Sequence, residues 1–277
     1  ANPTSLSRNR QTNVCIGHDG WVFVNCRPAG ISYFNHNDII GNQYVFNDKK
    51  GNGYNGYIAS LATVDNNTFL LGTTEGLLQW KRDINATTFI NYPDGKGDWL
   101  IRKEEVSSIA IDRRGRAWVG TIRNGIVVID QQLRLLRHIP ADTNNSKAIP
   151  LVSISQVVES PGGDIWVSGL SGICRIDPLT FRVENMKGNP LLRFNEKYYP
   201  MVFSDANNLW VGISNQGVYH YNLANGATTA YTKEKGLSNL IIYALDVDTT
   251  GTLYVGTAGG LTIFNSNGKS RTFTQKD

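Results

Sequence analysis

One pattern of residues recurs along the chain and constrains the fold more than any other feature. Each copy has a turn with Gly or Asn, a short apolar strand, a loop that ends in Gly, and a second apolar strand. The glycines that end these loops stand at positions 30, 76, 125, 172, 217 and 260, so their mean spacing is 46 residues. Six such periods account for almost all of the 277 residues. A repeat of about 20 to 50 residues is typical of solenoids, propellers and arrays.

The third copy shows the pattern most clearly. It reads Gly115-Arg116-Ala117-Trp118-Val119-Gly120-Thr121, followed by Gly125-Ile126-Val127-Val128-Ile129-Asp130. A further apolar strand precedes each turn and another follows each second strand, so each repeat predicts four short strands. Four strands in about 40 to 50 residues are typical of a propeller blade. We therefore predict an all-β fold, a β-propeller of six four-stranded antiparallel blades, or seven if the chain is a fragment.

The repeat also predicts the domain organisation. We expect one propeller domain over residues 1–277, with blades near 1–47, 48–98, 99–145, 146–190, 191–234 and 235–277. A single blade cannot bury both of its faces, so neighbouring blades stack on each other. A large side chain at one position of the second strand is expected to fill the space between blades: Phe23, Leu70, Trp118, Trp166, Trp210 and Tyr254.

Composition excludes several classes of function. Charged residues make up 18% of the chain, and the net charge of +4 is not concentrated in any block of Lys or Arg, so nucleic acid is not an expected partner. No apolar run approaches the roughly 18 residues of a membrane span, and the N-terminus lacks a charged and apolar signal segment. We expect contact with a membrane only through a segment absent from this chain.

The cysteines and histidines predict neither a disulfide framework nor a metal site. The three cysteines, Cys15, Cys26 and Cys174, form no CxxC pair, and the four histidines lie in different repeats. We expect no cofactor and no bound metal. The stretch from Asp246 to Gly251 begins like a calcium loop but lacks the distant Glu, so a turn is the prediction.

No catalytic motif stands out, and we predict that the chain is not an enzyme. The chain has no GxSxG elbow and no phosphate-binding glycine loop. Glu104 and Glu105 are adjacent acids, and on a strand adjacent side chains point to opposite faces. They are therefore not expected to flank one substrate as a pair of hydrolase acids would.

Three stretches resemble a known repeat family. They are Ala117–Thr121 with Gly125-Ile126, Leu253-Tyr254-Val255-Gly256-Thr257 with Gly260-Leu261, and the linking Lys235-Gly236-Leu237-Ser238-Asn239. The pattern resembles the two-component regulator propeller. This resemblance implies a bacterial, periplasmic or otherwise extracytoplasmic sensor region, often of a hybrid histidine kinase that responds to glycans. The family often has seven blades and a further β-sandwich, whereas this sequence shows six repeats and no such addition.

Loops carried on a rigid scaffold are where binding residues are expected. In a propeller, one face collects the loops between the second and third strands together with the connectors between blades. Rings beside amides, acids and Arg suit saccharides, although the rings could instead pack their own connectors. The candidate ligand-binding residues are Arg27, Tyr54, Tyr57, Glu75, Trp99, Arg123, Asn124, Tyr198 and Asn215.

These observations favour a non-enzymatic extracytoplasmic ligand-sensing or ligand-binding propeller, the sensor region of a two-component regulator. Its expected partners are an oligosaccharide or other small molecule, and a neighbouring domain or a second copy of the chain. Two alternatives stay open. One is a metal-dependent propeller enzyme similar to the streptogramin lyases, and the other is a structural propeller that docks other surface proteins.

Overall fold

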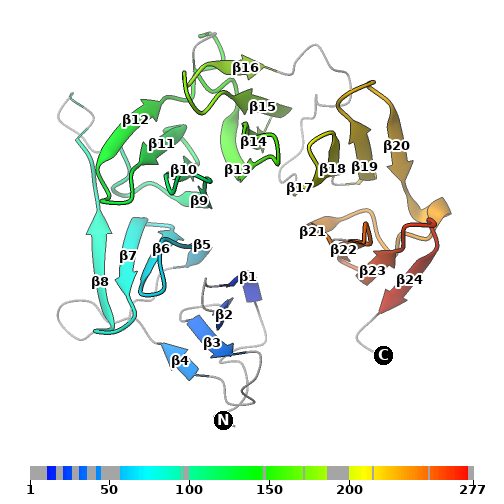
Figure 1. Ribbon diagram of the computed structural model, residues 1–277, viewed down its shortest axis with the longest axis horizontal. Helices are drawn as coiled ribbons and strands as arrows, with labels where there is room; N and C mark the ends of the chain where they lie inside the picture. The colour runs from blue at the N-terminus through cyan, green and yellow to red at the C-terminus, as the bar shows by residue number, and fades with distance from the viewer. Residues whose placement is uncertain are drawn as a thin grey trace. The chain divides into compact units, whose positions relative to one another are not determined.

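The computed structural model describes residues 11–16, 21–26, 31–35, 42–44, 57–93, 95, 100–145, 148–170, 172–185, 200–213, 215–248 and 250–273. The chain divides into two compact units, residues 1–141 and 142–277. The strands of both units are labelled in Figure 1.

The first unit consists of four-stranded antiparallel sheets whose strands follow one another in chain order. Adjacent strands pair as hairpins, for example Trp118 of β10 with Val128 of β11. The strands are β1 (Gln11–Ile16), β2 (Trp21–Cys26), β3 (Ile31–Asn35) and β4 (Asn42–Tyr44); β5 (Ile58–Thr63), β6 (Thr68–Thr73), β7 (Gly76–Lys81) and β8 (Ala86–Ile90); and β9 (Val106–Ile111), β10 (Ala117–Thr121), β11 (Ile126–Ile129) and β12 (Leu135–Ile139).

The second unit repeats this arrangement, and its described residues include one short 3-10 helix, η3 (Lys233–Lys235). Its strands are β13 (Val152–Glu159), β14 (Ile165–Leu170), β15 (Gly172–Ile176) and β16 (Val183–Asn185); β17 (Met201–Asp205), β18 (Asn208–Ile213), β19 (Gly217–Asn222) and β20 (Thr228–Tyr231); and β21 (Ile242–Val247), β22 (Leu253–Thr257), β23 (Gly260–Phe264) and β24 (Ser270–Phe273). The prediction of an all-β chain built from four-stranded antiparallel sheets is confirmed, and the sheets are propeller-like.

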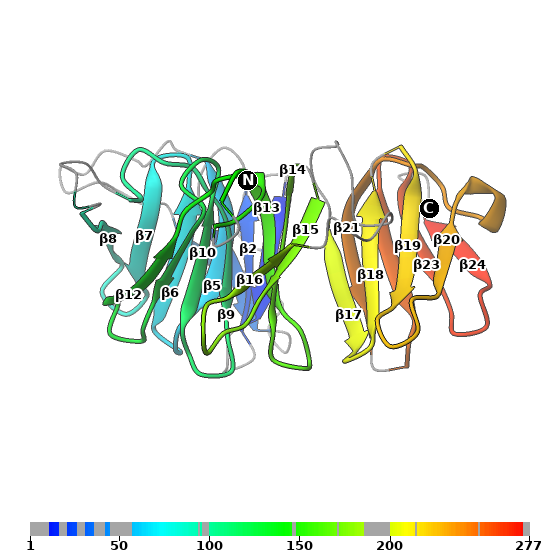
Figure 2. The same ribbon diagram turned by 90° about the horizontal axis from the view of Figure 1, so that it is seen from above.

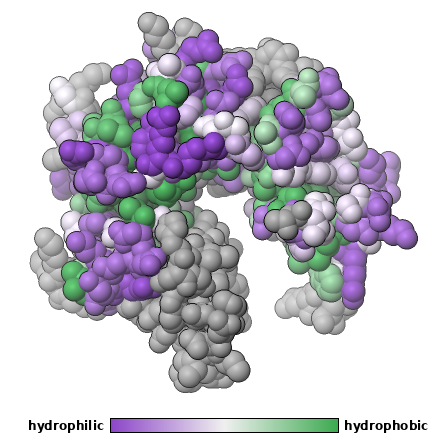
Figure 3. Space-filling model, viewed as in Figure 1, coloured by the Kyte–Doolittle hydropathy of each residue, from purple (hydrophilic) through white to green (hydrophobic). Residues whose placement is uncertain are grey.

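The core of the first unit lies between the β5–β8 sheet and the β9–β12 sheet. Every residue of β10 and of β11 is buried. Fully burying one aliphatic side chain contributes about 1.5–3 kcal/mol. The core residues are Leu70, Leu77, Leu100, Ile101, Val106, Ala117, Val119, Val127 and Ile129. Figure 3 shows hydrophilic side chains over much of the described surface, with apolar side chains between them.

The described residues of the second unit form two such cores. Trp166 contributes to the first of them, and its ring lies edge-on to Phe203 with 5.6 Å between the ring centroids. The second core includes Trp210, Val255 and Phe264. Each of these cores joins residues of two successive sheets, so the sheets of this unit bury apolar faces against one another.

The large side chains expected between blades are mostly buried. Trp118, Trp166, Trp210 and Leu70 are buried and Tyr254 is half-buried, while the side chain of Phe23 lies outside the described residues. The second sheet has Leu70 at this position, and its tryptophan lies on the third strand, β7, instead. Trp80 of β7 is fully buried, with its ring centroid 4.9 Å from that of Phe69.

The turn between the first and second strands of a sheet also holds the large aromatic residue. Asp112 Oδ2 accepts a hydrogen bond from Trp118 Nε1 at 2.9 Å, and Asp248 Oδ2 accepts one from the Tyr254 hydroxyl at 3.1 Å. In both cases the acceptor precedes the aromatic residue by six positions. Asp248 Oδ1 accepts the backbone N–H groups of Thr250 and Thr252, which is the arrangement of a turn.

A glycine stands at or just before the start of the third strand, because a side chain does not fit there. Gly125 has φ +76°, and a Cβ placed there would lie 2.3 Å from the carbonyl oxygen of Ile139. Gly217 has φ +112°, and its Cβ would lie 2.4 Å from the carbonyl oxygen of Tyr231. Only glycine adopts this backbone without strain and leaves room for the chain leaving the outer strand, so the repeat keeps Gly here.

Candidate functional site

The strands of each unit run between two ends, and hairpin turns lie at both (Figure 2). We call one end of the first unit the loop end. It comprises the β6–β7 turn (74–75), the β10–β11 turn (122–124) and the segment 100–105 before β9. Backbone hydrogen bonds join these parts. Thr74 N donates to Tyr57 O at 3.1 Å, and Lys103 N donates to Glu75 O at 3.0 Å. The predicted residues Tyr57 and Glu75 are thereby held at this end.

Arg123 is held at the loop end by a buried carboxylate. Its backbone N–H donates to Glu104 Oε1 at 2.6 Å, and its Nε donates to Glu104 Oε2 at 3.0 Å. The side chain of Glu104 is 5% exposed, whereas that of Arg123 is 71% exposed. A buried carboxylate is tolerated only when it is paired and hydrogen-bonded. Glu104 therefore serves as an anchor, and the Arg123 side chain extends from it into solvent.

Asn124 is fixed beside Arg123 by three hydrogen bonds. Its N–H donates to Thr121 Oγ1 at 2.9 Å, and its Nδ2 donates to the carbonyl oxygen of Leu100 at 3.0 Å. His138 Nε2 on β12 donates to the Asn124 carbonyl oxygen at 2.7 Å. The loop is therefore tied to both the preceding segment and the outer strand, and such a loop can present side chains in one geometry.

The Thr that ends the second strand caps this turn in three sheets. The hydroxyl of Thr121 donates to the carbonyl oxygen of Gly125 at 2.9 Å while it accepts the Asn124 N–H. Thr73 makes the same pair of bonds with Gly76 and Glu75, and Thr257 makes it with Gly260 and Gly259. The Gly-Thr part of the repeated motif thus encodes the turn itself.

Of the other predicted site residues, the structure describes only Asn215. Asn215 belongs to the second unit, where its N–H donates to the carbonyl oxygen of Leu240 at 2.9 Å and its φ is +63°. Arg27, Tyr54, Trp99 and Tyr198 lie outside the described residues. The candidate set as a ligand site stays a prediction.

Two acidic residues of the loop end lie outside the strand that the sequence predicted for them. We expected Glu104 and Glu105 to lie on a strand, but β9 begins at Val106 and both acids precede it. The Glu105 carbonyl oxygen accepts the N–H of Ile122 at 3.0 Å, while the Glu104 carboxylate binds Arg123. Glu104 lies in the sequence between two apolar residues that are buried, Ile101 and Val106, and this was the available sign that its side chain is buried as well. Its partner Arg123 is 19 residues further along the chain, so the sequence did not reveal the pair.

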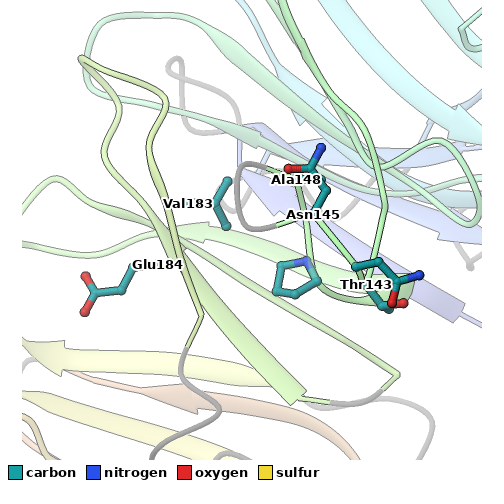
Figure 4. Close-up of a pocket in the computed structure, with 7 residues that line it drawn as sticks. Thr143, Asn145, Ala148, Val183 and Glu184 are labelled. Atoms are coloured by element: carbon teal, nitrogen blue, oxygen red, sulfur yellow. The ribbon is translucent and has the colours of Figure 1, made fainter.

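A groove in the second unit was also missed by the sequence analysis (Figure 4). It has a volume of about 450 Å³ and lies between the segment before β13 and the outer strand β16. Its carboxylate, Glu184, accepts a hydrogen bond from Arg175 Nη2 at 2.6 Å, and Arg175 Nη1 lies 3.3 Å from Asp164 Oδ2. The lining residues are Thr143, Asn144, Asn145, Ala148, Pro150, Val183 and Glu184.

His220 was the histidine considered for catalysis, and the structure places it in β19. Its Nε2 lies 2.9 Å from Asn208 Oδ1, and its ring stacks on Trp210 with 4.2 Å between centroids. Burial lowers the pKa of His220, and the charge of Asp205 opposes this in part. Within the part of the chain that the structure describes, no three His, Cys, Asp or Glu side chains gather as a metal site would require.

Comparison with known proteins shows which solved structures the chain is similar to. No family model matches the chain. Its fold matches that of the extracellular domain of BT4673, a proposed one-component system of B. thetaiotaomicron, with a TM-score of 0.75 and 18% identity. This match covers 96% of the chain and 37% of that domain. The fold of the chain therefore resembles that of this extracellular domain.

A second solved structure and one sequence relative agree with this resemblance. The extracellular domain of BT3049, a proposed hybrid two-component system of B. thetaiotaomicron, matches with a TM-score of 0.63 and 18% identity, over 96% of the chain and 40% of that domain. Histidine kinase P4 of Formosa agariphila is 31% identical over 85 residues, which are 28% of this chain. The chain spans 6% of the length of that kinase.

The fold also occurs in an enzyme. A catalytically inactive virginiamycin B lyase from Staphylococcus aureus, solved with quinupristin, matches with a TM-score of 0.67 and 12% identity. The match covers 95% of the chain and 84% of the lyase. Since one propeller fold hosts unrelated functions, the site has to decide between them. Among the described residues, no helix is both long enough and apolar enough to span a bilayer.

Proposed function

We propose that this chain is a ligand-sensing or ligand-binding propeller of six four-stranded blades, the periplasmic or otherwise extracytoplasmic sensor region of a bacterial two-component regulator. The observation that carries the proposal is the match of 96% of the chain to extracellular domains of sensor systems. The sequence repeat and the likeness to a histidine kinase over 85 residues support it independently. In this proposal the chain binds its ligand without catalysing a reaction.

The loop end of the first unit is the proposed binding surface. Its polar groups are held by the scaffold, because Glu104 anchors Arg123 and three hydrogen bonds fix Asn124. A ligand met by preorganised groups loses less free energy to ordering them. An oligosaccharide or another small polar molecule fits such a surface. The sequence also predicts that the rings of Tyr54, Trp99 and Tyr198 in the connectors cover the apolar faces of sugars.

Sensing requires that binding changes an association. We propose that the bound ligand alters how the propeller contacts a neighbouring domain or a second copy of the chain. The ligand can shift that equilibrium only by its difference in affinity for the two states. The chain therefore needs a partner surface besides its ligand site.

A thermal-shift screen of the purified chain against an oligosaccharide panel tests the proposal, with isothermal titration of each hit. A ligand that binds only the native state stabilises it by about 2.7 kcal/mol at 100 times its Kd. We expect a hit to raise the Tm of the wild type and not that of Arg123→Ala. Arg134→Ala is the matched control, because Arg134 is exposed to a similar extent, 75%, and also bound to a carboxylate. A hit that binds Arg123→Ala with unchanged affinity would contradict the loop end as its site.

The lyase fold favours a second candidate function. In that case the chain would cleave a streptogramin such as quinupristin with a divalent metal, and His220 would take part. The geometry of His220 is that of a packed side chain, because its ring stacks on Trp210 and its Nε2 is bound to Asn208. Incubation with quinupristin and Mg²⁺, followed by liquid chromatography and tandem mass spectrometry to distinguish the opened ring from the substrate of equal mass, decides between the two functions. Cleavage that is lost in His220→Ala would establish the enzyme and overturn the sensor proposal.

A further inference from the structure

The hydrogen bonds of Arg123 leave one side of its guanidinium group available. Among the described residues, Arg123 donates hydrogen bonds through its backbone N–H and its Nε, both to Glu104. The terminal nitrogens Nη1 and Nη2 belong to a side chain that is 71% exposed. These two nitrogens form the edge that binds a carboxylate or sulfate through two parallel hydrogen bonds. Glu104 thus orients the arginine from behind and leaves this edge for a ligand.

The backbone beside Glu104 is held in an unusual conformation. Lys103 has φ +58°, in the left-handed region that residues other than Gly seldom adopt. Hydrogen bonds from Lys103 N to Glu75 O at 3.0 Å and from Glu104 N to Ile101 O at 3.1 Å maintain it. Glu104 is therefore buried, while Lys103, the residue before it, is exposed. Strain of this kind is common where a side chain is positioned for function.

The exposed charges at the loop end are mainly positive. Arg102, Lys103 and Arg123 are exposed, whereas Glu104 is buried and Glu105 is half-buried. Glu75 is the exposed acid of the β6–β7 turn. An anionic group that approaches Arg123 therefore meets cations on the neighbouring segment, and their attraction adds to that of the guanidinium group.

We propose that Arg123 binds the carboxylate or sulfate group of an acidic saccharide, and that Glu104 is the positioning residue that orients it. This inference rests on the proposed function, since it names the ligand class of the same surface. Arg123 supplies a planar pair of N–H donors, and Lys103 beside Glu104 supplies a further positive charge. Neutral sugars lack the group that this arrangement recognises.

The chain offers a matched control at the other end of the same sheet. Arg134 N donates to Asp130 Oδ1 at 2.8 Å, and Arg134 Nε donates to Asp130 Oδ2 at 2.7 Å. Its side chain is 75% exposed. The backbone and Nε bonds and the exposure match those of Arg123, although Arg134 Nη2 also donates to Gln132 Oε1 at 3.4 Å, and the pair lies within one hairpin turn. A substitution of Arg134 therefore reproduces the chemical change without touching the loop end.

The experiment compares three probes by isothermal titration with the full chain. Trigalacturonate and α1,4-linked galactotriose differ in the carboxylate at C6, and galactose 6-sulfate provides the sulfate arm. We expect an acidic probe to bind at least tenfold more tightly than galactotriose. Arg123→Lys should lose at least tenfold in affinity for it, because Lys cannot form the paired hydrogen bonds. Arg134→Lys should leave the affinity unchanged.

Glu104→Gln tests the positioning role. The amide oxygen of Gln can still accept the Arg123 N–H, so the variant is expected to fold, and its urea unfolding midpoint checks this. We expect a loss of several-fold in affinity for the acidic probe and no change for any neutral sugar that binds. Equal loss for acidic and neutral sugars would show a merely structural role and overturn the assignment of Glu104.

The remaining outcomes separate this inference from the proposed function. Galactotriose binding as tightly as both acidic probes, with no effect of Arg123→Lys, would overturn the inference and leave a sensor for neutral ligands. Failure of both acidic probes to bind the wild type would also overturn the inference. The wider oligosaccharide panel then decides the proposed function separately. Binding of the carboxylate probe alone or of the sulfate probe alone supports the inference and identifies the source of the negative charge.

Discussion

The two ends of the β9–β12 sheet use the same hydrogen bonds in different ways. At one end, Asp112 binds the backbone N–H and Nε of Arg116, four residues later in the same turn. At the loop end, Glu104 binds the backbone N–H and Nε of Arg123, 19 residues later and across a whole hairpin. The first pair closes a turn within one stretch of sequence. The second pair joins two segments that only the fold brings together.

The two arginines differ most in their exposure. The side chain of Arg116 is 13% exposed beside a nearly buried Asp112, and the ring of Trp118 lies 5.5 Å from its guanidinium carbon. The side chain of Arg123 is 71% exposed. Arg116 is thus part of the packing, whereas Arg123 is presented to solvent. A carboxylate–arginine pair of the same kind therefore stabilises the fold at one end of the sheet and presents an arginine suited to binding at the other.

The largest expected effect is at the end that supports the fold. Asp112→Ala removes the acceptor of Trp118 Nε1 and of Arg116 Nε, and breaking a buried pair costs about 3–5 kcal/mol in the free energy of unfolding. Urea unfolding followed by tryptophan fluorescence measures it. Asp130→Ala, which opens the more exposed turn of Arg134, is the control and should cost less. Equal losses in the free energy of unfolding for the two variants would show that the buried pair contributes no more to stability than the exposed pair.

A smaller effect is expected from the cap at the loop end. Thr121→Val keeps the shape of the side chain but removes the bonds to Gly125 O and Asn124 N, which should cost about 1–3 kcal/mol. The variant should also weaken any ligand bound through Arg123, because the turn that carries it loosens. Thr121→Ser retains the hydroxyl and should stay near the wild type in both measurements. A variant as stable as the wild type would show that the turn does not depend on its cap.

The smallest effect is an acid dependence of the turns that hold the aromatic residues. Hydrogen bonds, first from the Thr250 side chain and then from the Thr252 backbone, lower the pKa of Asp248 to about 2. Because the folded pKa lies below the ordinary 3.8, Asp248 stabilises the fold above pH 4. This contribution is lost as the pH falls from about 4 to 2.

Asp248→Asn checks this dependence. The variant should be less stable than the wild type at pH 7, and its unfolding midpoint should fall less between pH 4 and pH 2. Thermal unfolding at pH 7, 4, 3 and 2 gives both numbers. Parallel pH curves for the two proteins would show that the turn carboxylate contributes nothing to acid sensitivity.

Local signals accounted for most of the strands. The repeated apolar stretch around Ala117–Thr121 and the Gly at position 125 predicted β10, its turn and β11, because those hydrogen bonds form between residues close in sequence. The further strand expected after each Gly-led strand is present in these two sheets as β12 and β8. Outer strands are half exposed, so their apolar pattern marks their ends less sharply.

The candidate site was predictable only in part. Glu75, Arg123 and Asn124 could be selected because turns between repeated strands are recognisable, and the structure places all three at one end of the first unit. Glu104 could not, because its chemistry depends on burial and on a partner across the hairpin. The groove beside β16 combines residues 143–150 with Val183 and Glu184, and no local pattern joins those two segments.

The sequence by itself determined the repeat, its four strands, the glycines of its loops and the turns with their aromatic partners. These depend on backbone geometry and on contacts between residues a few positions apart. Tertiary structure alone decided which charged side chains are buried and which are presented to solvent. Glu104 and Lys103 are neighbours in sequence, yet one is buried against Arg123 and the other is exposed. Burial arises when sheets pack against one another, so the sequence of a single strand or turn does not determine it.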